Sequence, residues 1–295
     1  MIDTRSEPTL SACMVHTTFA TAPILNELLT ALACRFSSWQ HDEGNVADFT
    51  LFAESADALE EQLVRVRKGV SEWEDLLPDP VSIGDPYTIL REDWAESWKR
   101  HFQPIEVSDR VLIVPPWITE RPDLPAVVEI DPGMSFGTGQ HETTRACLGF
   151  VDRLCAEKPD ARMLDIGCGS GILAITAAKL GLSEIRALDY DVASVSSAVD
   201  NAVANKVEDT ISFEAADLAD GLEGKYDIVV ANIFANVLIA FADTVTGAVA
   251  EGGSLVLSGI LDPQFADVEA RYLEAGFHVV DRVMIGQWTS GLLRR

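Results

Sequence analysis

The sequence predicts an α/β protein, with a doubly wound, mostly parallel seven-stranded sheet preceded by a smaller α+β domain. Three observations lead to this prediction. Apolar runs of strand length alternate with helical patterns from residue 162 to residue 275. Three closely spaced glycines follow the first of these runs, at 167–171. Two further apolar runs, at 277–284 and 287–293, have almost nothing between them, so they must form an antiparallel hairpin.

Composition sets limits on the function. The chain has 295 residues, of which 47% are apolar, which is enough for two packed domains. Its formal net charge of −25 would repel nucleic-acid backbones and attract a basic protein partner, although solubility alone is an alternative reason for the charge. The five cysteines are odd in number and include no C-x-x-C pair, so neither disulfides nor a metal site is expected.

Targeting signals are not evident in the sequence. The N-terminus lacks the basic and apolar regions of a signal peptide. The longest apolar tract, 228–242, contains two asparagines and is too short to cross a bilayer. We therefore expect a cytoplasmic protein without a membrane partner, and we expect a monomer.

The first 90 residues follow a strand–helix–strand–strand–helix–strand order. Strands are expected at 12–19, 36–40, 48–53 and 87–90, and helices at 21–35 and 56–68. This order is typical of a ferredoxin-like module. Because no residue in it has an evident catalytic role, residues 1–92 are interpreted as a substrate-docking domain, with a structural appendage as the alternative.

A short helix is expected to join the two domains. Trp94, Trp98 and Phe102 recur at helical spacing and form one apolar stripe, and Pro104 ends the helix. We therefore predict a linker helix at 93–104, followed by a catalytic domain at 105–295 that begins with a strand at 110–117.

A glycine-rich segment at 131–145, D-P-G-M-S-F-G-T-G-Q-H-E-T-T-R, precedes a helix expected at 143–156. Capping of that helix explains either Thr143 or Thr144. It does not explain the density of glycine, which indicates a loop fitted closely to a ligand. His141 is interpreted as a hydrogen-bonding loop residue rather than a catalytic base.

The rest of the chain alternates regularly between the two kinds of element. Strands are expected at 162–166, 184–188, 211–215, 226–231 and 253–258, and helices at 171–180, 192–205, 235–249 and 263–275. Such alternation gives a parallel sheet covered on both faces, with ligands at the carboxyl ends of the strands.

The turn after the strand at 162–166 predicts the cofactor. A dinucleotide site needs G-x-G-x-x-G, but Ile172 stands where the third glycine would be, which disfavours an NAD-dependent enzyme. The sulfonium and ammonium of S-adenosylmethionine would be stabilised by a nearby carboxylate, and Asp165 provides one. The pattern D-x-G-x-G-x-G resembles motif I of the class I methyltransferases, so Asp165, Gly167, Gly169 and Gly171 are predicted to bind the cofactor.

Two more polar residues end strands of the predicted sheet. Asp189 ends the second strand, 22 residues after Gly167, where a carboxylate can accept both ribose hydroxyls. Asn232 ends the fourth strand at the same edge of the sheet. Its amide offers a carbonyl oxygen to an incoming amine without trapping it as an ammonium, so Asn232 is predicted to be catalytic as well as cofactor-binding. Capping of the next helix is the alternative role of Asn232.

Together these segments resemble a known family. The E-D-W at 92–94, the segment at 131–145, motif I at 165–173 and A-N-I at 231–233 resemble the bacterial methyltransferases of ribosomal protein L-eleven (PrmA type). The resemblance implies an N-terminal domain that docks the ribosomal protein and a catalytic domain that methylates its lysine side chains and N-terminal amine. It also implies that Thr144, Gly167, Asp189 and Asn232 contact S-adenosylmethionine.

Three other functions remain open from the sequence. The first is lysine methylation of another protein, such as the electron-transfer flavoprotein β subunit. The second is a small-molecule methyltransferase, which would have a closed apolar lid in place of a docking domain. The third is a binding module without catalysis, which would have lost the glycines or Asn232, and both are present.

Overall fold

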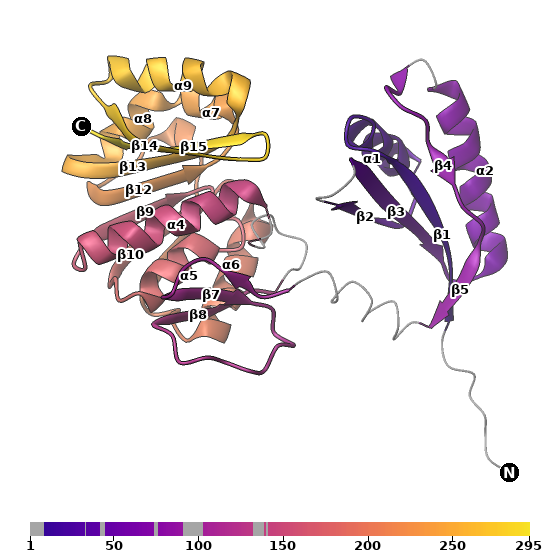
Figure 1. The fold of residues 1–295 in the computed structure, drawn as a ribbon, viewed down its shortest axis with the longest axis horizontal. Helices are drawn as coiled ribbons and strands as arrows, with labels where there is room; N and C mark the ends of the chain where they lie inside the picture. The colour runs from indigo at the N-terminus through magenta and orange to yellow at the C-terminus, as the bar shows by residue number, and fades with distance from the viewer. Residues whose placement is uncertain are drawn as a thin grey trace, which may run out of the picture. The chain divides into compact units, whose positions relative to one another are not determined.

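A computed structural model describes residues 9–32, 34–41, 45–73, 76–90, 103–131, 139 and 141–295 of the chain. The chain divides into two compact units, residues 1–101 and residues 102–295. Each unit has its own layers of helix and sheet (Figure 1). The linker helix predicted at 93–104 lies outside the described residues up to residue 102.

The N-terminal unit is a small antiparallel sheet with two helices. Its elements are β1 (Thr9–Thr18), α1 (Ala22–Ala31), β2 (Phe36–His41), β3 (Val46–Ala53), α2 (Ala56–Glu72), β4 (Ser82–Ile83) and β5 (Tyr87–Leu90). The sheet order is β2-β3-β1-β4, and β5 also pairs with β1. The predicted order of strands and helices is confirmed, with β4 as an addition, whereas the ferredoxin-like assignment stays a prediction.

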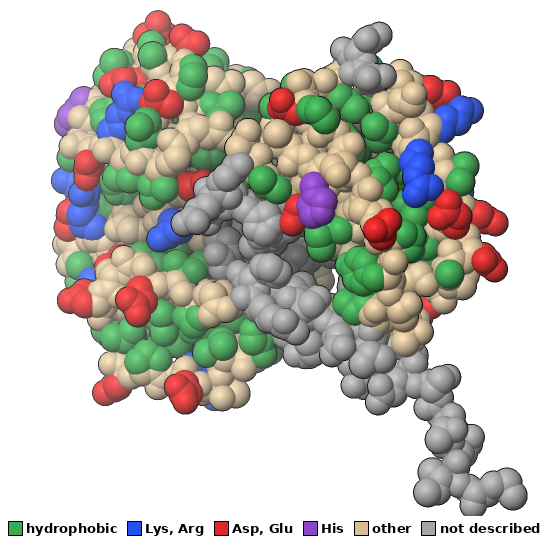
Figure 2. Space-filling model, turned by 45° about the vertical axis from the view of Figure 1, so that its right-hand side comes forward, with side chains coloured by type: hydrophobic (Ala, Val, Ile, Leu, Met, Phe, Trp, Pro, Cys, Tyr) green, Lys and Arg blue, Asp and Glu red, His purple; other side chains and the backbone are tan. Residues whose placement is uncertain are grey.

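A single apolar cluster holds this unit together. The inward side chains of β1 and β3 alternate along each strand, as Cys13 and Val15 do on β1, and pack against leucines of both helices. Ser55 caps α2 by accepting a hydrogen bond from the backbone N–H of Ala58. Acidic side chains are spread over the visible face of both units and do not gather in one patch (Figure 2).

The C-terminal unit is built on a seven-stranded sheet of order β11-β10-β9-β12-β13-β15-β14. Its strands are β9 (Arg162–Ile166), β10 (Glu184–Asp189), β11 (Ile211–Ala215), β12 (Tyr226–Asn232), β13 (Val249–Leu261), β14 (His278–Ile285) and β15 (Trp288–Arg294). β15 is antiparallel to both of its neighbours, whereas the pairs among β9 to β13 are parallel. The doubly wound, mostly parallel sheet is therefore confirmed, and the reversed strand, β15, lies between β13 and β14.

Helices cover both faces of this sheet (Figure 1). Its helices are α4 (Glu142–Glu157), α5 (Ile172–Lys179), α6 (Val192–Asn205), α7 (Ala235–Ala240), α8 (Ala242–Ala248) and α9 (Asp262–Glu274). The first three pack on one face and the last three on the other, because neighbouring residues of the buried strands, such as Met163 and Leu164, point to opposite sides. Both faces are therefore buried, as a parallel sheet requires.

Two predictions about this unit need correction. The single helix predicted at 235–249 is wrong, because the helix breaks at Phe241 into α7 and α8 and Val249 already belongs to β13. A strand that was not predicted, β8 (Ala126–Glu129), pairs in parallel with β7 (Val111–Val114). With β6 (Ile105–Glu106) these strands form a separate three-stranded sheet.

Two kinds of feature are absent from the described residues. In that part of the chain, no helix is both long enough and apolar enough to span a membrane. The same residues contain no group of histidine, cysteine and acidic side chains placed to hold a metal ion.

Candidate functional site

The turn between β9 and α5 depends on its glycines. Gly167, Gly169 and Gly171 have φ angles of 71°, 53° and 79°, in the left-handed region that favours glycine. A Cβ at Gly167 would lie 2.4 Å from Cγ2 of Ile233, so the close approach of these two segments also requires glycine. Gly167 and Gly169 line a cavity at the carboxyl edge of the sheet. Gly171 is not among the lining residues and is instead the N-cap residue that precedes α5.

The Asp189 carboxylate is anchored on this turn. Its Oδ2 accepts a hydrogen bond from the backbone N–H of Gly169 at 2.8 Å, and its Oδ1 accepts one from the N–H of Asp191 at 2.9 Å. Asp189 lines the cavity, as the sequence predicts. Because each carboxylate oxygen can accept a second hydrogen bond, the group can receive two hydroxyls of a ligand without leaving its anchors.

We expect Asp189→Ala to weaken the binding of S-adenosylmethionine by about 1 to 3 kcal/mol, the usual effect of losing hydrogen bonds to a charged group. Isothermal titration calorimetry measures the change. Asp191→Ala is the matched control, because Asp191 caps α6 without lining the cavity. It should lower thermal stability and leave the affinity unchanged. An unchanged dissociation constant for Asp189→Ala would contradict the assignment.

Asp165 lies behind the turn and does not line the cavity. Its side chain is fully buried, and its Oδ2 accepts a hydrogen bond from the N–H of Ala174, in the first turn of α5. Within the described residues its Oδ1 has no hydrogen-bond partner. Burial raises the pKa of this carboxyl to about 7, and the negative charge of Asp189 acts in the same direction. Asp165 therefore lies off the cavity wall, and its role in cofactor binding, which stays a prediction, would act through the turn.

The raised pKa of Asp165 predicts a pH-dependent stability. Between pH 3.8 and about 7 the native carboxyl keeps a proton that the unfolded chain releases, so the free energy of unfolding falls as the pH rises through this window. Asp165→Asn has no such titration. Relative to the natural chain, we expect the variant to gain stability from pH 4 to pH 8, by at most about 4 kcal/mol at about 1.36 kcal/mol per pH unit. Urea unfolding at the two pH values checks this, and a constant difference would contradict it.

Asn232 ends β12 at the same edge of the sheet and lines the cavity. Its Nδ2 donates a hydrogen bond to Oγ1 of Thr144, a residue of α4, at 3.5 Å. Its Oδ1 is buried and has no hydrogen-bond partner within the described residues. Thr144 itself is buried and does not line the cavity, so the structure places it behind Asn232, where it orients the amide, and not on the cavity wall.

His141 begins α4 as its N-cap. Its Nδ1 accepts a hydrogen bond from the backbone N–H of Thr143 and lies 2.8 Å from Thr143 Oγ1. Its ring meets the ring of Trp288 edge to face, at a centroid distance of 5.0 Å. Burial lowers the pKa of His141, so the ring is neutral at pH 7. The expectation of a hydrogen-bonding residue is confirmed, and the expectation that Thr143 or Thr144 caps α4 is wrong.

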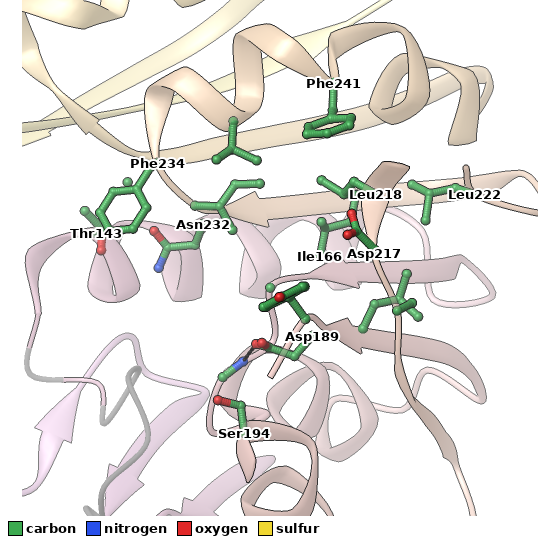
Figure 3. A pocket seen from close by; sticks show the side chains of 18 of the residues that line it. Thr143, Ile166, Asp189, Ser194, Asp217, Leu218, Leu222, Asn232, Phe234 and Phe241 are labelled. Carbon is green, nitrogen blue, oxygen red and sulfur yellow. Dashed lines mark hydrogen bonds between the residues drawn. The ribbon is translucent and has the colours of Figure 1, made fainter. Parts of the chain in front are cut away.

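The cavity has a volume of about 730 Å³, within the range of roughly 300 to 1,000 Å³ for small-molecule sites. Figure 3 shows three regions of the cavity wall. Asn232, Thr143 and Phe234 form one region, Asp189 and Ser194 form a second, and apolar side chains form the third. The lining residues in the described part include no lysine or arginine. The carboxylates of the cavity wall therefore favour a cationic ligand such as a sulfonium.

Sequence reasoning missed several lining residues. They are Ser194, Asp217, Phe234, Phe241 and Trp288. A sequence signal existed for Asp217, which follows β11 at the edge where ligands bind. Nothing local distinguished the aromatic residues. The F-G-T segment at 136–138 of the predicted loop lies outside the described residues.

Known proteins match the chain over most of its length. A family profile described as "Ribosomal protein L11 methyltransferase (PrmA)" matches residues 51–295. The ribosomal protein L11 methyltransferase of Bacillus cytotoxicus is 34% identical over 241 residues, which cover 79% of this chain and 75% of the relative. That of Desulfitobacterium hafniense is 39% identical over 232 residues, which cover 78% and 73%.

A solved structure is also similar. The crystal structure of ribosomal protein L11 methylase from Lactobacillus delbrueckii subsp. bulgaricus has a TM-score of 0.61 and 31% identity, and covers 66% of this chain and 99% of that chain. The class I methyltransferase sheet predicted from the sequence is thereby confirmed. From these matches, and from the arrangement of the turn, carboxylate and amide, the chain is an S-adenosylmethionine-dependent methyltransferase and belongs to the ribosomal protein L11 methyltransferase (PrmA) family.

Proposed function

We propose that this chain methylates ribosomal protein L11 on nitrogen, at lysine side chains and at the N-terminal amine. The relatives named above support the substrate. The observation that carries the choice of nitrogen is the amide of Asn232 in the cavity wall, whose buried Oδ1 has no hydrogen-bond partner within the described residues. A buried carbonyl oxygen without a donor is costly, and an incoming N–H group would satisfy it.

The residues of the cavity fit S-adenosylmethionine. The backbone of Gly167 and Gly169 would leave room for the ligand, Asp189 would receive the ribose hydroxyls, and Asp217 adds negative charge beside the apolar region. When bound, S-adenosylmethionine supplies an electrophilic methyl group. The chain's own contribution is to place the acceptor nitrogen in line with that group, because catalysis of such a displacement consists mainly of placement and proton removal.

The acceptor must be uncharged before it reacts. Deprotonating a lysine of pKa about 10.4 at pH 7 costs about 4.6 kcal/mol, whereas an α-amino group of pKa near 8 costs about 1 kcal/mol. The Oδ1 of Asn232 would accept an N–H of the neutral amine, and transfer of the amine from water into the cavity would disfavour its ammonium form. A neutral amide also avoids the strong attraction by which a carboxylate would retain the ammonium, so this site needs no strong base.

We assign the parts of the chain accordingly. Residues 1–92 dock the protein substrate, 93–104 link the two parts, and 105–295 carry out catalysis. The net charge of −25 supports a basic protein substrate rather than nucleic acid. The enzyme acts as a monomer, and it acts in the cytoplasm, because its ribosomal substrate is made there.

The test is incubation of the purified enzyme with S-adenosylmethionine labelled in the methyl group, first with purified L11 and then with the soluble proteins of the cell. We expect label in L11 and, by mass spectrometry of its peptides, methyl groups on lysine and the N-terminal amine. Label in another protein alone, such as the electron-transfer flavoprotein β subunit, or in a small molecule alone, would overturn the assignment.

A further inference from the structure

Helix α6 carries one stripe of small and amide side chains that leads away from the cavity. Ser194 lines the cavity, and Ala198 lies next to the glycine turn, since a Cβ on Gly171 would be 3.0 Å from its Cβ. Asn201 and Asn205 continue the stripe and are buried. Steps of four, three and four residues keep all four on one face of a helix.

The two asparagines hold backbone groups of different segments. Asn201 Nδ2 donates to the carbonyl oxygen of Ser170, in the glycine turn, at 2.9 Å, and Asn201 Oδ1 accepts from the N–H of Asp131 at 3.2 Å. Asn205 instead binds both backbone groups of Glu129, at the end of β8. Because Asn201 bonds to the glycine turn and Asn205 does not, a substitution of Asn205 is a matched control for the same substitution of Asn201.

Asp131 and Gly139, the described residues on either side of 132–138, are both connected to the glycine turn. Asp131, on one side, is tied through Asn201 to Ser170. Gly139, on the other side, has a φ of +89° and is buried, and a Cβ there would lie 3.2 Å from Cδ1 of Ile172, the first residue of α5. Ser170 and Ile172 flank Gly171, so both connections reach the same short stretch of the turn.

We propose that Asn201 is a positioning residue for cofactor binding. By bonding to Ser170 and Asp131 together, it fixes the carbonyl side of the turn against the segment that follows β8 and so holds Gly167 and Gly169 where they line the cavity. It does not touch the cavity itself. This inference rests on the proposed binding of S-adenosylmethionine at the turn, and it is independent of which protein receives the methyl group.

The test compares Asn201→Ala with Asn205→Ala. For Asn201→Ala, we expect the dissociation constant of S-adenosylmethionine and its KM to rise about tenfold while kcat stays within about twofold, because the turn is misplaced but Asn232 is untouched. For Asn205→Ala we expect a comparable loss of thermal stability with the dissociation constant within about twofold. Calorimetry, thermal unfolding and steady-state kinetics give these quantities.

Two results would overturn the proposal: equal weakening of affinity in both variants, which shows a merely structural role, or unchanged affinity in Asn201→Ala. Should Asn201→Ala fail to fold, Asn201→Ser decides by the same criteria, because its short side chain leaves a smaller void and bonds within its own helix. A natural chain that binds S-adenosylmethionine but leaves L11 unlabelled would reject the proposed substrate and leave this inference intact.

Discussion

Gly167→Val will lower the affinity for S-adenosylmethionine by more than about 100-fold, or about 3 kcal/mol. Two effects add. The φ of 71° is strained for a β-branched residue, and the new Cβ would lie 2.4 Å from Cγ2 of Ile233, a residue that follows Asn232 and also lines the cavity. The turn must therefore shift away from the ligand. Calorimetric titration measures the loss.

A second glycine separates these two effects. Gly252 has a φ of 70°, nearly equal to that of Gly167, but a Cβ there meets nothing within 4 Å. Gly252→Val therefore introduces a similar backbone strain without the clash, at an exposed position away from the cavity. We expect lower stability with normal affinity. Normal affinity in Gly167→Val would mean that the cofactor does not bind at this turn.

Asn232→Ala will reduce the rate of methyl transfer about 100-fold, the order of magnitude found when one oriented polar group is removed from a reacting centre. The substitution removes an Oδ1 that has no partner among the described residues, and with it the 3.5 Å hydrogen bond from Nδ2 to the buried Oγ1 of Thr144. Because these two effects on stability oppose each other, thermal stability should change much less than activity. Thr144→Val, which removes only the partner of Nδ2, should reduce the rate less.

Single-turnover measurements with saturating S-adenosylmethionine test this prediction, because they separate the chemical step from binding. Asn236→Ala is the control. Asn236 lies four residues further along, is exposed and does not line the cavity, so its removal should change neither rate nor affinity. An Asn232→Ala enzyme with the natural rate would show that the amide takes no part in the reaction.

Helices and strands whose ends are marked by local sequence features, such as a capping residue, could be predicted from the sequence. The bounds of α6 and β11 agree with the prediction to the residue. Asp191 caps α6, and Lys206 ends it in the left-handed conformation. The glycine turn was predictable for a similar reason, because positive φ angles at alternate residues leave a pattern that glycine alone fits well.

What the sequence did not show depends on contacts between distant segments. β8 has four residues and is defined by its pairing with β7. The helical pattern of apolar residues over 235–249 gives no sign of the break at Phe241, whose side chain lines the cavity. The burial of Asp165 follows from the packing of α5 against β9, so its distance from the cavity could not be read from its place in motif I.

The most direct test of the account is a crystal structure of this enzyme with S-adenosylmethionine. We expect the ligand in the cavity between Gly167 and Asn232, its ribose hydroxyls on Asp189 and its methyl group directed toward Oδ1 of Asn232. A ligand whose methyl group points toward Leu218 and Phe241, or a cavity that stays empty while the enzyme is active, would contradict it.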